Sequence, residues 1–230
     1  MVERMNRLQR SMAGRTLALL SVLLTGVTAE AAAHTSKRTV VLLHGLARSA
    51  SSMDRMAVSL EAAGYRVCNV EYPSRKHSIA ILAAEHVAPE IAKCVVDPDE
   101  PLDFVTHSLG GIVLRQLVAT GAIENVGRVV MLGPPNHGSE VVDKLGTWYL
   151  FDALNGPAGR ELGTSATSVP NTLGPATFQV GIIAGRRSIN WLLSLLIPGS
   201  DDGKVSIDSA KLDGMQDFLA VPAAHPFLMT

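Results

Sequence analysis

The chain has 230 residues, of which 47% are hydrophobic and 18% are charged, so it can bury one substantial core and is expected to form one domain. This composition excludes a disordered, collagen-like or coiled-coil chain. A formal net charge of -1 gives no electrostatic basis for binding nucleic acid, which requires a clustered basic face. The expected partners are therefore small and neutral, or apolar.

The first 33 residues differ from the rest in composition. The stretch "MVERMNRLQRSMAGR" carries four arginines and one glutamate and runs into the uncharged "TLALLSVLLTGVTA". That apolar stretch is about a dozen residues long, which is short for a membrane span. Small residues fit a cleavage site after Ala29 or Ala33. The sequence predicts an export signal over 1–33 and a periplasmic or secreted domain over 34–230. The alternative is an uncleaved anchor in the inner membrane.

Strands and helices are expected to alternate over the next hundred residues. "TVVLLHG" is typical of a buried strand, and "SMDRMAVSLEAAG" has the apolar spacing of a helix. Further segments follow in the same alternation: the strand "YRVCNVEYP", a helical stretch over 78–94 with a break near Pro89, the strand "LDFVTHS", the helix "LGGIVLRQLVATG" and the strand "VGRVVMLGPP". Such βαβ units predict an α/β fold with a mostly parallel sheet and helices on both faces.

The periodic pattern weakens after this point. Residues 136–175 and 186–200 are expected to be loop or lid-like insertions, the first containing a helix near its start and then a loop rich in Gly, Pro, Ser and Thr. The last two strands are expected in "TFQVGIIAG" and "MQDFLAVPAAH". The apolar "NWLLSLLIPG" has two interpretations, a wall or lip of an acyl pocket that contacts a lipid interface, or a core helix.

The chain contains two cysteines, Cys68 and Cys94. Cys68 falls in a predicted strand and Cys94 near the end of the helix that follows it, so a bridge between them is geometrically feasible. An oxidising compartment would permit the bond. The other interpretation is two small buried apolar residues, and the sequence leaves both open.

The stretch "FVTHSLGGIVLR" places Ser108 between a strand and a helix. A serine hydroxyl is a weak nucleophile, and a sharp strand-to-helix turn at the edge of a parallel sheet is where it can be exposed. The Leu109 amide would lie at the helix N-terminus, and the Leu46 amide in the turn after "HG"; both can stabilise a negative oxygen. Thr106 stands where the G-x-S-x-G pattern has its first glycine, which crowds the turn.

A base and an acid are expected downstream of the serine, in the order Ser, acid, His. Only His137 and His225 follow Ser108, and His137 precedes every plausible acid at a strand end, so His225 is the predicted base. A polar turn with glycine is where an orienting carboxylate is expected, which selects the adjacent aspartates at 201 and 202.

The ordered set of H-G-L, H-S-L-G-G, "PPNHGS", S-D-D-G-x-V and a late histidine resembles bacterial α/β-hydrolase lipases and esterases. The resemblance extends from about Arg38 to His225. It implies an α/β-hydrolase fold and carboxylic-ester hydrolysis without a cofactor. It also implies roles for individual residues: Ser108 as nucleophile, His225 as base, Asp202 as orienting acid with Asp201 as fallback, and the Leu46 and Leu109 amides as oxyanion hole.

The resulting hypothesis is an exported serine esterase or lipase acting on a small-molecule or lipid ester. No metal is implied, since no cysteine or histidine cluster has ligand spacing. Two alternatives remain: an acyltransferase that uses the same triad, and a non-catalytic binding protein with this fold. The printed chain ends five residues after His225, where the resembled fold normally adds a final helix. This departure leaves the placement of His225 open, and the oligomeric state is not predicted.

Overall fold

The computed structural model of the chain describes residues 37–145, 149–189, 194 and 197–229. The export signal expected over 1–33 lies outside these residues, as do 190–193 and 195–196 of the apolar segment after the fifth strand. No helix in the described ranges is long and apolar enough to cross a membrane.

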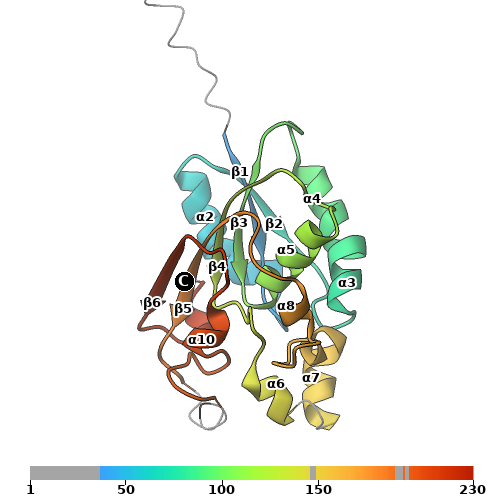
Figure 1. The fold of residues 1–230 in the computed structure, drawn as a ribbon. Helices are drawn as coiled ribbons and strands as arrows, with labels where there is room; N and C mark the ends of the chain where they lie inside the picture. The colour runs from blue at the N-terminus through green and yellow to red at the C-terminus, as the bar shows by residue number, and fades with distance from the viewer. Residues whose placement is uncertain (1–36, 146–148, 190–193, 195–196, 230) are drawn as a thin grey trace, which may run out of the picture. The chain divides into compact units, whose positions relative to one another are not determined.

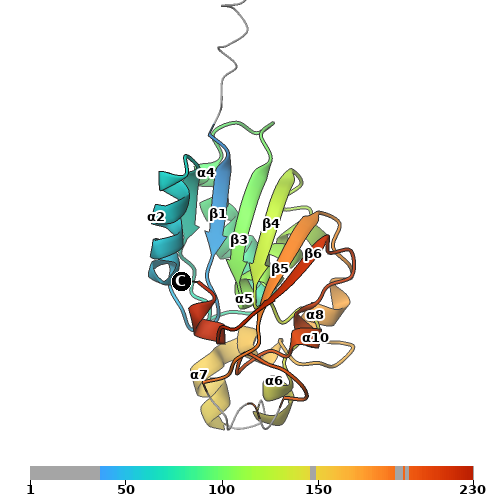
Figure 2. The ribbon, with the colours of Figure 1, turned by 90° about the vertical axis from the view of Figure 1, so that its left-hand side faces the viewer.

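Six strands form one sheet, and each neighbouring pair is parallel. The strands are β1 (Thr39–Leu43), β2 (Arg66–Val70), β3 (Leu102–His107), β4 (Val126–Leu132), β5 (Gln179–Gly185) and β6 (Asp217–Val221). They lie in the order β2-β1-β3-β4-β5-β6, and Figure 2 shows β1, β3, β4, β5 and β6 side by side. Parallel neighbours require crossover connections, which the helices supply. The expected α/β class with a mostly parallel sheet is confirmed.

Helices cover both faces of this sheet. The helices of the described residues are α2 (Asp54–Ala62), α3 (Ile79–Ile81), α4 (Ala88–Cys94), α5 (Leu109–Ala119), α6 (Glu140–Leu145), α7 (Tyr149–Arg160), α8 (Val169–Thr172) and α10 (Ile207–Ala210). Figure 1 shows α2 on one face and α3, α4 and α5 on the other. Helices α6 and α7 lie beyond the carboxyl ends of the strands (Figures 1 and 2).

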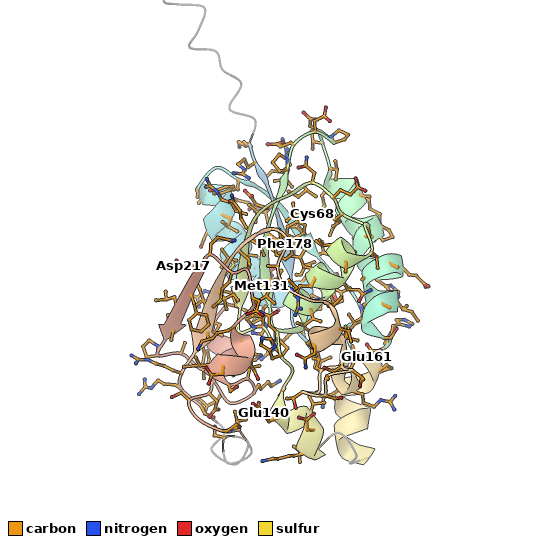
Figure 3. The ribbon with its side chains drawn as sticks, viewed as in Figure 1. Cys68, Met131, Glu140, Glu161, Phe178 and Asp217 are labelled. Atoms are coloured by element: carbon orange, nitrogen blue, oxygen red, sulfur yellow. A yellow bond between two sulfur atoms is a disulfide. The ribbon has the colours of Figure 1, made fainter. Side chains whose placement is uncertain are left out.

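Two apolar cores follow from this layering. The larger contains Met131, near the centre of the molecule in Figure 3, and packs against α5 through residues such as Ile112. The smaller lies on the α2 face and includes Leu42, Leu228 and Met229. The last two follow a short 3-10 turn, η3 (His225–Phe227). This turn therefore leads the residues that follow it into the core.

The helical stretch over 78–94 is divided into three parts. Between α3 and α4 lies a π-helical segment, η2 (Leu82–Val87). The helix does not stop near Pro89: Val87 and Ala88 keep helical dihedral angles, and the interruption is a change from π- to α-helix at Ala88. Pro89 lies in the first turn of α4, directly after this change, and it cannot donate a helical hydrogen bond. The wider π turn could not be predicted from apolar spacing alone.

The segment 136–175 contains more helix than expected. The loop predicted after the first helix is partly helical: α7 runs to Arg160 across a break at Gly156, and α8 follows. The segment is tied to the body of the fold at two glutamates, both labelled in Figure 3. Glu161 accepts a hydrogen bond from the Ile79 amide at 2.7 Å. Glu140 accepts from two hydroxyls, those of Ser206 and Ser209.

A disulfide joins Cys68 to Cys94, and Cys68 is labelled in Figure 3. The sequence left two interpretations open, a disulfide or two small buried apolar residues, and the structure contains the disulfide. It connects β2 to the end of α4 across a sequence separation of 26. It therefore staples an edge strand of the sheet to the helix that covers it.

Candidate active site

Ser108 lies at the turn between β3 and α5 with φ 51° and ψ -119°. Residues with a side chain rarely adopt a positive φ, and such strain costs about 1 to 3 kcal/mol. The Ser108 amide donates a hydrogen bond to the Leu132 carbonyl at 2.9 Å, which fastens the turn to β4. The serine is thus held in the conformation that projects its hydroxyl beyond the carboxyl edge of the sheet.

Two glycines let the turn pack despite the threonine at 106. A side chain at Gly110 would overlap the Leu43 and His44 carbonyl oxygens, so α5 approaches β1 closely only because that side chain is absent. At Gly111 an added Cβ would lie 3.3 Å from Thr106 Oγ1. Thr106 is fully buried, and its hydroxyl has no hydrogen-bond partner within the described residues. The crowding expected at Thr106 is therefore relieved by Gly111.

Asp202 and His225 form a buried pair. His225 Nδ1 donates to Asp202 Oδ2 at 2.7 Å, and the His225 amide donates to the Asp202 carbonyl at 2.9 Å. The other carboxylate oxygen accepts from the amides of Lys204 and Val205 at 3.0 and 2.9 Å. Asp202 is 2% and His225 4% exposed, so the imidazole is fixed at its Nδ1 edge.

Asp201, the fallback acid, is placed differently. Its Oδ1 accepts hydrogen bonds from the Ser194 hydroxyl and the Gly203 amide, both at 2.7 Å. These bonds engage Asp201 locally, and among the described residues the carboxylate that hydrogen-bonds His225 is that of Asp202.

Gly133, directly after β4, lies beneath the Asp202–His225 pair. Its φ is 54°, and an added Cβ would lie 3.1 Å from both Asp202 Oδ2 and His225 Nδ1 and 2.9 Å from Leu228 Cδ1. A side chain here would therefore press on both partners of the hydrogen bond.

His107 supports the same pair from the neighbouring strand. Its Nε2 lies 3.1 Å from the His225 carbonyl oxygen and donates to it, and the two rings are 4.9 Å apart. Burial, and secondarily the charge that His225 can carry, hold the pKa of His107 well below its usual range. His107 is thus a neutral donor that positions the backbone of His225. Sequence reasoning did not identify this role, and adjacency to Ser108 was the signal available.

The loop after β1 carries the Leu46 amide and is held by the segment after β2. The Tyr72 hydroxyl donates to the His44 carbonyl, and the Tyr72 ring stacks on that of His44 with centroids 4.1 Å apart. The Ala47 amide donates to Ser74 Oγ at 3.1 Å. In the described part of the chain, neither the Leu46 nor the Leu109 amide donates a hydrogen bond. Both are therefore available to a bound oxygen atom.

Two cavities meet at Ser108. The first, of about 240 Å³, is walled mainly by apolar side chains such as Val141, Leu162 and Val205. The second, of about 170 Å³, contains Asp202 and His225. Three residues line both: Leu46, Ser108 and Lys204. The site therefore has an apolar side and a polar side, divided at the serine.

The structure brings Ser108, Asp202, His225 and Leu46 to one cavity, and Leu109 follows Ser108 directly. His137 stays exposed on its loop, where its Nδ1 pairs with Asn171. Residues that sequence reasoning missed include Tyr72 and Ser74, which hold the loop after β1. They follow β2, so the rule that places ligands at the carboxyl ends of parallel strands could have found them.

Comparison with known proteins gives both a family and a fold. A family model described as palmitoyl protein thioesterase matches residues 39–174, more than half of the chain. No curated protein matches the chain. Among solved structures, the mature form of a Bacillus licheniformis lipase is 22% identical with a TM-score of 0.66, and the match covers 85% of this chain and 87% of that one.

Two further structures show the breadth of the similarity. A phospholipase from Legionella pneumophila is 16% identical with a TM-score of 0.65, over 83% of this chain and 53% of that one. This chain therefore spans about half the length of the phospholipase. A type II thioesterase of the yersiniabactin pathway is 17% identical with a TM-score of 0.52, over 85% and 88% of the two chains. The α/β-hydrolase fold expected from the resemblance is confirmed.

Proposed function

The chain belongs to the palmitoyl protein thioesterase family, and we propose that it is an exported serine hydrolase that cleaves carboxylic esters through an acyl-enzyme on Ser108. One observation carries the proposal: Ser108, strained at its turn, lines the same cavity as the buried Asp202–His225 pair. The composition of residues 1–33 supports export, and so does the Cys68–Cys94 disulfide, because such bonds persist in oxidising compartments.

The proposed reaction has two halves. His225 accepts the Ser108 proton while Oγ attacks the carbonyl carbon, and the Leu46 and Leu109 amides stabilise the oxyanion. The bond to the leaving group breaks, and His225 delivers the proton to the departing oxygen or sulfur. Water then adds to the acyl-enzyme with His225 as base, which releases the carboxylic acid and restores Ser108. Asp202 holds the His225 ring in the required tautomer.

Thioester hydrolysis is a second candidate, because the matching family model is that of a thioesterase. The same groups serve both reactions, since the attacked atom is a carbonyl carbon in each. The acyl part is expected in the apolar cavity of about 240 Å³. A methylene group occupies about the volume of a water molecule, ~30 Å³, so this cavity holds roughly eight carbons.

Hydrolysis of a chain-length series of p-nitrophenyl esters by the wild type and by Ser108→Ala tests the proposal. We expect the wild type to prefer acyl chains near eight carbons and Ser108→Ala to lose at least about 10³-fold in kcat/KM. Asp202→Asn should lose far more activity than Asp201→Asn, which is the matched control. Equal turnover by wild type and Ser108→Ala would show that Ser108 is not the nucleophile, and no turnover by a folded wild type would favour the non-catalytic alternative.

A further inference from the structure

The two sides of the site can be assigned to the two parts of an ester. Ser108 lines both cavities, but His225 lines only the smaller one. In the proposed reaction His225 protonates the departing atom, so the leaving group must lie on the His225 side. The acyl chain is then left to the apolar cavity. This assignment rests on the function proposed above.

The smaller cavity carries two cations, Arg48 and Lys204. Its carboxylate belongs to Asp202, whose oxygens already accept hydrogen bonds from His225 Nδ1 and from the amides of Lys204 and Val205. In the described ranges, the side chains of Arg48 and Lys204 form no ion pair and no hydrogen bond. The cavity thus presents two cations and one carboxylate, so the charge of Asp202 offsets the positive charge only in part.

The neighbouring recess does not reverse this excess of positive charge. Arg48 also lines a neighbouring recess with Glu71, Arg75 and Lys76. The Glu71 carboxylate accepts from the Ala50 amide at 2.6 Å and lies 3.8 Å from His44 Nε2. This recess therefore adds two further cations, Arg75 and Lys76, beside the single carboxylate of Glu71.

The titration of Lys204 agrees with an excess of positive charge. Burial, then the charge of Arg48, lower the pKa of the Lys204 ammonium, and the charge of Asp202 acts in the opposite direction. Lys204 remains exposed to solvent, so it can meet an incoming ligand. An anion between the two cations would offset their repulsion.

We propose that the smaller cavity binds a phosphate group carried by the leaving part of the substrate. The substrates are then acyl esters or thioesters whose alcohol or thiol bears a phosphate, with Arg48 and Lys204 as its ligands. Arginine and lysine are the side chains best suited to phosphate, through paired N–H groups and a point charge respectively. The phosphate takes no part in bond breaking; it positions the leaving atom near His225.

Two matched substrate pairs test the proposal and separate the two sources of such a phosphate. One pair is S-hexanoyl-4'-phosphopantetheine and S-hexanoylpantetheine, which share the acyl-thioester and the pantetheine chain and differ only in the phosphate. The other is dihexanoyl phosphatidic acid and dihexanoylglycerol. We expect kcat/KM to be about tenfold or more higher for the phosphate-bearing member of at least one pair, mainly through KM. Added salt should reduce this ratio.

Variants assign the effect to the two cations. In Arg48→Gln/Lys204→Gln the ratio should fall to within about twofold of one. The control Arg55→Gln/Arg128→Gln removes the same charge from exposed positions outside both cavities, and it should keep the wild-type ratio. Ser108-dependent turnover with a ratio near one in both pairs would overturn the inference and leave the proposed function standing. If none of the four substrates is cleaved while p-nitrophenyl esters still are, the inference alone fails; no Ser108-dependent turnover of any of these substrates, p-nitrophenyl esters included, would overturn both.

Discussion

Ser108 occupies a backbone conformation that is unfavourable in isolation, and its neighbours hold it there. The Leu132 carbonyl binds its amide, and the absence of a side chain at Gly110 lets α5 approach β1. The same dependence on close approach recurs at Gly133, beneath the Asp202–His225 pair. The site thus depends on glycines, which leave room for close packing, as well as on the residues proposed to take part in the reaction.

Gly133→Ala is expected to lower kcat/KM for p-nitrophenyl esters by about 10- to 100-fold while the protein stays folded. The added methyl would lie 3.1 Å from both atoms of the Asp202–His225 hydrogen bond, and small displacements of catalytic groups have costs of that order. Kinetics of the purified variant provide the measurement.

Gly121→Ala is the matched control for this substitution. Gly121 has φ 69°, and no atom of the described residues lies within 4 Å of an added Cβ there. Both variants bear the strain of a side chain at positive φ, about 1 to 2 kcal/mol, but only one contacts the pair. Equal activities of the two variants would contradict the proposed role of Gly133.

For single residues, prediction from sequence succeeded where the order of the catalytic groups along the chain left few candidates. The order Ser, acid, His selected His225, and the structure brings Asp202 into contact with it. The catalytic roles stay predictions. The bond from His107 to the His225 carbonyl could not be foreseen, because it joins a strand end to a turn 118 residues away whose path depends on tertiary packing.

At the scale of elements, the loops after β1 and β2 act together. Tyr72 and Ser74, after β2, hold the turn that presents the Leu46 amide. β2 is in turn an edge strand, and the Cys68–Cys94 disulfide fastens it to α4. The proposed oxyanion donor is thus supported through an edge strand that is covalently stapled.

Reduction of the Cys68–Cys94 bond is expected to lower the free energy of unfolding by about 3 to 4 kcal/mol. The bond closes a loop with a sequence separation of 26, and the loss of chain entropy in the unfolded state gives a value of this size. Urea unfolding with and without dithiothreitol provides the measurement. Cys68→Ala/Cys94→Ala should be insensitive to the reductant; a wild type that is equally insensitive would show that the bond contributes nothing.

Strands and helices with a regular apolar pattern could be predicted from the sequence. Irregular helical segments could not. Buried strands such as β1 follow directly from an apolar, β-branched run. The π-helical segment η2 and the helix break at Gly156 depend on how each helix meets its neighbours. The sequence left the disulfide open for the same reason, since pairing requires a distance that only the packed β2–α4 unit defines.

For the molecule as a whole, two buried histidines near the site couple stability to pH. Burial lowers the pKa of His44 and, more strongly, that of His107 from the usual 6.5; the charges of His225, Lys204 and Arg48 lower the latter further. A base with a lowered folded pKa binds fewer protons in the folded than in the unfolded state. Its contribution to stability is complete above pH 6.5 and is lost as the pH falls below that value.

We therefore expect the free energy of unfolding to fall between about pH 7 and pH 5, by up to ~1.4 kcal/mol per pH unit for each histidine. Urea unfolding across this range measures the slope. His107→Gln keeps a donor of similar reach but cannot titrate, so its slope should be smaller by that amount. An unchanged slope in this variant would mean that His107 does not bind a proton on unfolding.

The fold of the whole molecule could be predicted from the sequence, whereas the cavities of the site could not. The α/β-hydrolase fold follows from alternating strands and helices and is confirmed by the solved structures. The division into an apolar and a cationic cavity on either side of Ser108 was not predictable. Arg48 and Lys204 are 156 positions apart in the sequence, and only folding brings them to one cavity.

The central claim, that Ser108 is the nucleophile, is tested most directly by site-resolved labelling with a fluorophosphonate. The probe forms a covalent bond only with an activated serine, and mass spectrometry of the digested protein locates the adduct. The account predicts one adduct per chain, on Ser108, and none in Ser108→Ala. An adduct on another residue of the wild type, or equal labelling of Ser108→Ala, would contradict it.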